Sequence, residues 1–216
     1  EDEKLIGMAG ASSSALIVVN SRQAARKLFS LCRGKRFHLT TYMTPIDRAR
    51  VICNIKKELK ALKEDYPNGN APAERRVIVV STSLIEAGVD LDFDAVFREL
   101  TGLDSILQAG GRCNREGRHK DAKVCVFERT QRAQPDIKTS IAKGIINEFE
   151  DISSAEAVRA YYERLHYSNR DAIVRKSLSQ MCESLQTIPF AQYSVKLIDS
   201  RMMSIVVPID ATSRKY

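Results

Sequence analysis

Short apolar runs separated by helical patterns are the feature that most limits what this chain can fold into. The clearest run is residues 16–20, and further strands are predicted at residues 37–41, 77–80, 95–99 and 123–127. Between the runs, apolar residues recur at spacings of three and four, as in amphipathic helices. Strands that alternate with helices predict an α/β fold, with a parallel sheet flanked by helices.

The sequence also indicates where helices begin and end. One helix is predicted over residues 22–32. For the next, Thr44 offers an N-cap, Pro45 stands at the first helical position and Asp47 completes a weak capping box. A long amphipathic helix is expected to follow and to end in the turn-rich residues 66–72. A further helix is expected between the last two strands.

The character of the chain changes after the fifth predicted strand. Residues 129–138 are polar and turn-prone, and helical patterns follow at residues 154–166 and 173–185. The last segment, residues 195–209, is β-like. We therefore expect a first domain over residues 1–130 and a mainly helical accessory or linker region over residues 131–216, which ends in the β-like segment.

One motif places two arginines close to a glutamine. Gln108, Arg112 and Arg115 belong to the pattern Q-x-x-G-R-x-x-R, and their spacing predicts one face of a helix. Guanidinium groups on one face can make forked hydrogen bonds to a phosphate chain. The alternative is an ordinary surface ion pair with Asp104 or Glu116.

A second motif, T-x-x-x-x-x-G-x-D, lies just upstream. Its members are Thr82, Gly88 and Asp90. Gly88 can adopt a backbone conformation closed to other residues, and Asp90 can accept a hydrogen bond from a ribose hydroxyl. Thr82 follows a predicted strand, where α/β sheets bind ligands. The alternatives are an Asx-type turn at Asp90 and a strand-end cap at Thr82.

In this order the two motifs resemble motifs V and VI of superfamily 2 helicases. Residues 76–118 are most similar to the CRISPR-associated helicase-nuclease of type I systems, in which motif V runs into an L-D-x-D-F-type stretch, here around Asp92 and Phe93. Residues 15–29, 38–48 and 188–208 are similar to further segments of that family. The resemblance implies a RecA-like fold, namely the second, C-terminal motor domain of such a helicase.

The resemblance also implies roles for individual residues. Arg115 would be the arginine finger on the γ-phosphate of ATP, Arg112 a second phosphate contact, and Gln108 a link to the phosphate loop of the partner domain. Gly88, Asp90 and Gly111 would lie at the nucleotide, with Gly111 leaving space for close approach. Contacts to nucleic-acid phosphates are expected from strand ends and one helix start, at Ser21, Arg22, Thr40, Thr41, Thr82 and Ser83.

Other parts of an ATP site do not occur in the sequence. It contains no G-x-x-x-x-G-K-[ST] loop, no D-E-x-[DH] box and no His-Asp dyad of a nuclease. We therefore expect ATP and Mg²⁺ to be held mainly by an amino-terminal motor domain of a longer polypeptide, with no metal ligands in this chain. The chain alone is expected to be inactive, and enzymatic only within the full-length ATP-dependent helicase.

These inferences define an expected function and two alternatives. The expected function is that of a helicase domain in an ATP-dependent single-stranded DNA translocase, acting with the amino-terminal motor and nuclease domains and with a CRISPR RNA-guided surveillance complex. One alternative is a superfamily 2 RNA helicase, although Ser83 departs from the motif V pattern T-D-x-A-x-R-G-x-D. The other alternative is an adaptor that binds nucleic acid or protein without turnover.

Charge and cysteine usage agree with this expectation without requiring it. The net charge of +7 and pI of about 9.2 permit a polyanionic partner. The five cysteines form no C-x-x-C pair, which indicates small core residues in a reduced, cytoplasmic compartment. No apolar run approaches the length of a membrane span, so no membrane association is expected.

Overall fold

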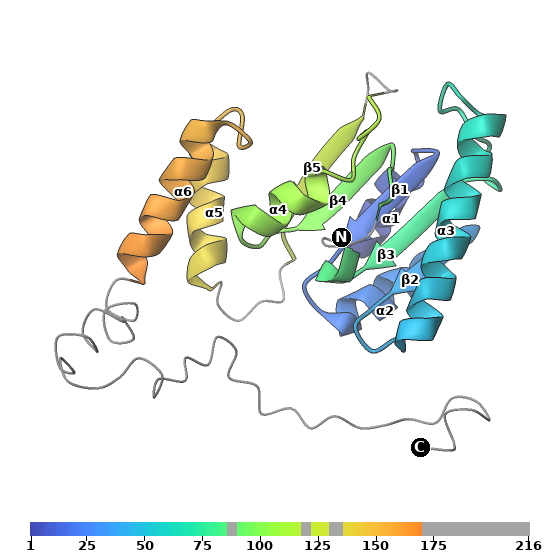
Figure 1. Cartoon of the computed structure of the whole chain (residues 1–216), viewed down its shortest axis with the longest axis horizontal. Coiled ribbons are helices and arrows are strands. Elements are labelled where there is room, and N and C mark those ends of the chain that lie inside the picture. The colour runs from blue at the N-terminus through green and yellow to red at the C-terminus, as the bar shows by residue number, and fades with distance from the viewer. Residues whose placement is uncertain (86–89, 118–121, 130–135, 170–216) are drawn as a thin grey trace, which may run out of the picture. The chain divides into compact units, whose positions relative to one another are not determined.

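The computed structural model describes residues 1–85, 90–117, 122–129 and 136–169 (Figure 1). The helices are α1 (Asp2–Ala9), α2 (Arg22–Leu31), α3 (Pro45–Asp65), α4 (Leu103–Gly110), α5 (Ile137–Glu148) and α6 (Ala155–Ser168), with a short 3-10 turn η1 at Ser83–Ile85. The strands are β1 (Ser14–Val18), β2 (Lys35–Leu39), β3 (Val77–Ser81), β4 (Ala95–Glu99) and β5 (Lys123–Phe127).

All five strands are parallel and form one sheet in the order β2-β3-β1-β4-β5. In the middle of the sheet, Ile17 of β1 lies beside Val80 of β3 on one side and Phe97 of β4 on the other. Every residue of β1, β3 and β4 is buried, which explains why these strands have no polar alternation. The predicted parallel sheet flanked by helices is confirmed.

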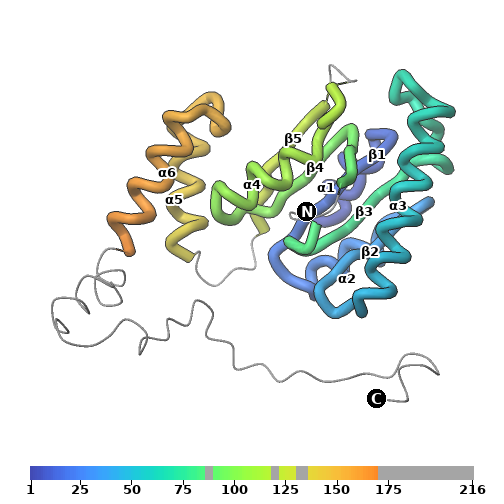
Figure 2. The backbone as a smooth tube through the Cα atoms, in the orientation of Figure 1, coloured from blue at the N-terminus to red at the C-terminus, as the bar shows by residue number. Residues whose placement is uncertain are grey.

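Helices cover both faces of the sheet (Figure 2). On one face, Leu59 of α3 packs in a core cluster with Leu16 and Val79. On the other face, Leu28 of α2 and the buried side of α1 pack with Ile17. Successive residues of β1 thus serve opposite cores, as the pleat of a strand requires.

Side-chain caps fix the starts of α2, α3, α5 and α6. The backbone N–H of Asp47 donates to Thr44 Oγ1 at 3.2 Å, and Pro45 opens α3, so the predicted start is confirmed. The hydroxyl of Thr44 also donates to the Asp47 carboxylate at 2.9 Å. Ser154 caps α6 in the same way, where the N–H of Ala157 donates to Ser154 Oγ at 3.2 Å.

A third core cluster joins helices that the sequence pattern did not connect. Leu103 and Ile106 of α4 pack with Ile145 of α5 and Tyr161 of α6. Residues 1–170 form one compact unit, and α5 begins within the segment predicted to be a linker. The boundary at residue 130 stays a prediction, and the helix at residues 173–185 and the segment at 195–209 lie outside the described residues.

Two sequence expectations about single elements differ from the structure. Helix α1 was not predicted, because only Leu5 and Ala9 of its eight residues are buried and its pattern is weak. Cys53 was expected in the core but is exposed on α3. Among the described helices, none is long and apolar enough to cross a membrane.

Candidate functional site

Parallel strands bring three predicted nucleic-acid contacts to one edge of the sheet. Thr82 follows β3, which lies between β2 and β1. The N–H of Thr82 donates to the carbonyl of Leu39 at 3.2 Å, and the N–H of Val19 donates to Ser81 at 3.0 Å, so the three strand ends lie side by side. Thr40, next to Leu39, is therefore a neighbour of Thr82, whereas Ser21 follows β1.

The residues at this edge differ in how accessible they are. Thr40 and Thr82 are 6% and 5% exposed, and Thr82 Oγ1 is buried with no hydrogen-bond partner among the described residues. Ser21 is exposed, but Ser21 Oγ accepts the N–H of Ala24 at 3.1 Å and thus caps α2. The other predicted contacts, which are all exposed, are Arg22, Thr41 and Ser83.

The predicted helical face for Gln108, Arg112 and Arg115 is wrong. Helix α4 ends at Gly110 and Gly111 is its C-cap, so both arginines lie in the turns that follow. Two consecutive glycines weaken the helix. The chain beyond them pairs instead with Phe93, whose N–H donates to the carbonyl of Arg112 at 2.9 Å.

The predicted site residues at the end of α4 differ in their exposure and contacts. Gln108 is exposed on α4 and its side chain forms no hydrogen bond with a described residue, whereas Arg112 is half-buried. A Cβ on Gly111 would lie 3.6 Å from the carbonyl oxygens of Gln108 and Leu107, an ordinary contact. The packing of this chain therefore does not require glycine there, and its predicted role concerns only an approaching partner.

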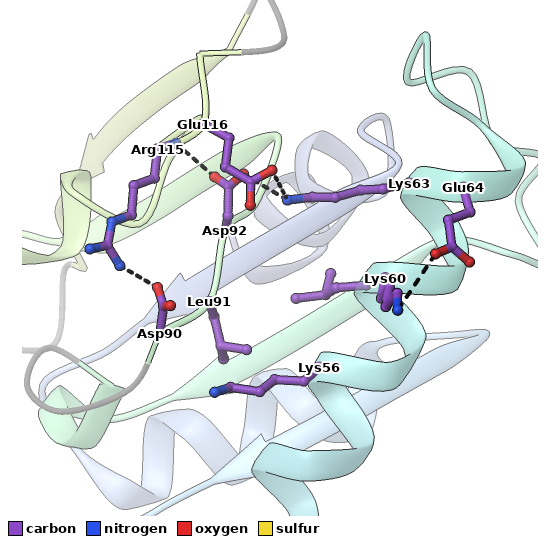
Figure 3. A pocket seen from close by; sticks show the side chains of 10 residues that line it. Lys56, Lys60, Lys63, Glu64, Asp90, Leu91, Asp92, Arg115 and Glu116 are labelled. Carbon is purple, nitrogen blue, oxygen red and sulfur yellow. Dashed lines mark hydrogen bonds and ion pairs between the residues drawn. The ribbon is translucent and has the colours of Figure 1, made fainter.

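Arg115 lies next to two carboxylates of the motif V segment (Figure 3). Its guanidinium forms an ion pair with Asp90, in which the Arg115 side chain is 53% exposed. Its backbone N–H donates to Asp92 Oδ1 at 2.7 Å. The structure thus brings two predicted site residues, Arg115 and Asp90, together. The alternative partners Asp104 and Glu116 do not hold the Arg115 guanidinium; Glu116 lies 3.3 Å from Lys63 Nζ.

The carboxylate of Asp92 is also bound by a lysine of α3. Lys63 Nζ lies 2.7 Å from Asp92 Oδ2, and the two side chains are only 19% and 13% exposed. The sequence alone predicts no role for either residue. Asp92 could have been found from its place two residues after Asp90, but no pattern in the sequence singles out Lys63.

These residues line a cavity of about 500 Å³ between α3 and the turn after α4. Figure 3 shows that positively and negatively charged side chains line this cavity from both of its sides. They include Lys56, Lys60, Lys63, Asp90, Arg115 and Glu116. Gly88, the third member of the motif V prediction, lies outside the described residues.

Cys113 in the same turn is not suited to act as a nucleophile. Burial, and after it the negative charge of Asp92, raises the pKa of the Cys113 thiol to about 11. The thiol is therefore protonated at neutral pH, whereas the thiolate is the reactive form.

A second cavity, of about 470 Å³, lies between α2 and the end of β2. Its lining includes Arg22, Arg26, Lys27, His38, Thr40 and Tyr42. Burial, and after it the positive charge of Arg26, lowers the pKa of His38. This cavity adjoins the strand-end threonines, on the face opposite α3.

Comparison with known proteins places this arrangement in a family. A family model described as CRISPR-associated nuclease/helicase Cas3, C-terminal, matches residues 11–118. The CRISPR-associated nuclease/helicase Cas3 of Haloferax volcanii is 66% identical over 38 residues, which are 18% of this chain and 4% of that protein. The Cas3 of Methanothermobacter thermautotrophicus is 30% identical over 102 residues, 47% of this chain and 11% of that protein.

Solved structures show the same fold. The crystal structure of T. fusca Cas3-ATP matches with a TM-score of 0.55 and 17% identity, over 86% of this chain and 24% of the other. A structure described as a CRISPR-associated protein matches with a TM-score of 0.56 and 21% identity, over 85% of this chain and 22% of the other. The chain thus spans less than a quarter of each of these proteins.

Proposed function

The chain belongs to the Cas3-like C-terminal family of CRISPR-associated nuclease/helicases, and we propose that it is the second motor half of an ATP-dependent single-stranded DNA helicase. In this proposal the amino-terminal motor and nuclease domains belong to the same polypeptide, and a CRISPR RNA-guided surveillance complex recruits it. The chain itself supplies arginines to the nucleotide and hydroxyl groups to the DNA.

The observation that carries the proposal is the ion pair between Arg115 and Asp90. Motif V and motif VI are 25 residues apart at these positions, and the fold joins them on an exposed surface. A guanidinium that is half exposed and paired with a single exposed carboxylate can exchange that partner for a phosphate at little cost, because exposed ion pairs contribute little to stability.

Phosphoryl transfer explains what such a guanidinium would do. Negative charge on the transferred γ-phosphoryl group is stabilised by forked hydrogen bonds from arginine. We propose that Arg115 turns from Asp90 to the γ-phosphate when the two motor halves close, and that Asp90 is then free to accept from the ribose. Arg112 is proposed as a second phosphate contact, and Gln108 as the link to the partner domain.

Magnesium has no proposed ligand in this chain. The described residues gather no group of three or more His, Cys, Asp or Glu side chains that could hold a metal ion. We propose that the amino-terminal motor domain holds the metal that accompanies ATP and also supplies the loop that holds the phosphates.

The proposed DNA contacts come from the carboxyl edge of the sheet. Thr41 and Ser83 present exposed hydroxyl groups near adjacent strand ends, and Thr40 and Thr82 lie buried behind them. Such groups bind the sugar-phosphate backbone without reading bases. Binding of this kind suits a translocase that must move along any sequence.

The test is ATP turnover by the full-length enzyme with Arg115→Ala. The expected result is a loss of roughly a thousandfold or more, the contribution that arginine fingers make, with DNA binding and melting temperature nearly unchanged. Arg115→Lys should restore little, because a point charge cannot make the forked contact.

Arg75→Ala is the matched control for this experiment. Arg75 is also an arginine paired with one carboxylate, that of Asp65, and its side chain is 41% exposed, but it lies outside the cavity. Turnover that survives Arg115→Ala, or a melting temperature that falls sharply with it, would show that Arg115 is a structural partner of Asp90.

A further inference from the structure

The cavity between α2 and the end of β2 has three cations, Arg22, Arg26 and Lys27, among its seven described lining residues. No acidic residue is among its described lining. Lys27 is paired with Asp2 at 2.9 Å, but Arg22 and Arg26 form no ion pair with a described residue. The groove therefore carries positive charge without an internal counterion.

The positive charge of this groove does not depend on histidine. Burial and the charge of Arg26 lower the pKa of His38, so its ring is neutral at pH 7. The ring also stacks on Phe29, with centroids 5.3 Å apart. His38 thus adds no charge to the groove, and its positive charge comes from Arg22, Arg26 and Lys27.

An exposed aromatic ring stands at the mouth of the groove. Tyr42 is 77% exposed, although the guanidinium of Arg22 lies 3.6 Å from the centre of its ring. Because one face is covered by Arg22, such exposure means that the rest of the ring is open to solvent. The cation–π contact also holds Arg22 near the ring before any ligand arrives.

We propose that this groove holds a segment of single-stranded nucleic acid, with a base stacked on the open face of Tyr42 and adjacent phosphates bound by Arg22 and Arg26. An aromatic platform beside cations is the arrangement that binds single strands without sequence preference. Thr40 lines the groove and Thr41 is the next residue in the chain. The groove is therefore continuous with the strand ends that carry the proposed DNA contacts. An acidic peptide would use the arginines but would not require the open ring.

The inference rests on the proposed DNA contacts but is tested separately from ATP turnover. The experiment measures binding of the 216-residue chain to two fluorescein-labelled probes by anisotropy: a twelve-residue oligo(dT) and an abasic strand of the same length. Tyr42→Ala should weaken oligo(dT) binding by about tenfold, the typical contribution of one stacked base, and should leave the abasic strand unaffected. Tyr42→Phe should bind both probes like the original chain, because the ring is retained.

Charge reversal tests the phosphate contacts. Arg26→Glu should weaken both probes and should reduce the slope of log affinity against log salt by about 0.7, the effect of losing one phosphate contact on a single strand. Arg159→Glu makes the same change in net charge at an exposed position of α6, away from the groove, and should have a much smaller effect.

Three results would overturn the inference. The first is that the chain binds neither probe. The second is that Tyr42→Ala weakens both probes equally or neither, which would remove the stacking role. The third is that Arg159→Glu weakens binding as much as Arg26→Glu, which would make binding a matter of net charge alone. In each case a loss of turnover in Arg115→Ala would still support the motor function.

Discussion

The backbone N–H of Arg115 donates to the carboxylate of Asp92 at 2.7 Å, so the segment after motif V holds the motif VI arginine in place. The other oxygen of Asp92 lies 2.7 Å from Lys63 Nζ on α3. These contacts link α3 to the turn that carries Arg115. In the proposed mechanism the side chain of Arg115 would exchange partners while its backbone stays held by Asp92.

Removing the support from α3 should impair catalysis more than folding. In the full-length enzyme, Lys63→Met should lower ATP turnover by about ten- to a hundredfold, since small displacements of a catalytic group have effects of that size. Lys63→Arg should retain more turnover. The measurement is the steady-state rate of phosphate release, together with the melting temperature.

The neighbouring lysine provides the control for Lys63. Lys60 lines the same cavity, but its pair with Glu64 is long, at 3.8 Å, and exposed. Lys60→Met should therefore change turnover little. Equal effects of the two substitutions would show that the total charge of the cavity matters and that Asp92 is not positioned by Lys63.

The chain alone should not hydrolyse ATP. Its sequence has neither a phosphate loop nor a D-E-x-[DH] box, and arginines supplied from one side cannot hold the nucleotide in position for attack. We expect no phosphate release above background by the purified 216-residue chain, with or without single-stranded DNA. Steady turnover that co-purifies with the chain would disprove the assignment of the phosphate site to another domain.

Acid should destabilise the fold through His38. Its folded-state pKa is lowered by burial and by Arg26, so the unfolded chain binds the proton more readily. The stability from the neutral ring is therefore present above the unfolded pKa of about 6.5 and is lost as pH falls below that value. His38→Gln should reduce the fall in melting temperature between pH 7.5 and 5.5, whereas the exposed His166→Gln should not.

The sequence predicts buried strands well and their polar ends less well. The bounds of β4 and β5 are those predicted. Strand β1 begins two residues earlier than predicted, at Ser14. The N–H of Ser14 donates to the Asp94 carboxylate at 2.8 Å, and the hydroxyl of Ser14 accepts from the N–H of Asp94 at 3.0 Å. A polar residue can start a strand when its partner is 80 residues away, and a local pattern cannot show that partner.

The candidate site shows the same limit more strongly. The motif spacing predicts roles for Arg115 and Asp90, and the fold brings the two side chains together. The spacing could not show that the helix stops at Gly110, because the competing contact is the pairing with Phe93, which is distant in sequence. Lys63 was missed for a related reason, since its partner Asp92 lies on another element.

Thr82 allows the clearest separation of structural and functional roles. Its hydroxyl oxygen is buried and has no hydrogen-bond partner among the described residues. Burying a hydroxyl without a partner costs roughly 1–3 kcal/mol, so removing it should not destabilise the fold. Thr82→Val, which keeps the volume, should leave the melting temperature equal or higher.

In the full-length enzyme the same substitution should reduce the stimulation of ATP turnover by single-stranded DNA and leave basal turnover unchanged. The reason is that a hydroxyl kept unpaired at a strand end can donate to a phosphate when the strand binds. Thr41→Ala, at the exposed neighbouring strand end, should act in the same direction. A lower melting temperature for Thr82→Val would identify the hydroxyl as a strand-end cap, and an equal loss of basal and stimulated turnover would place it in the nucleotide cleft instead.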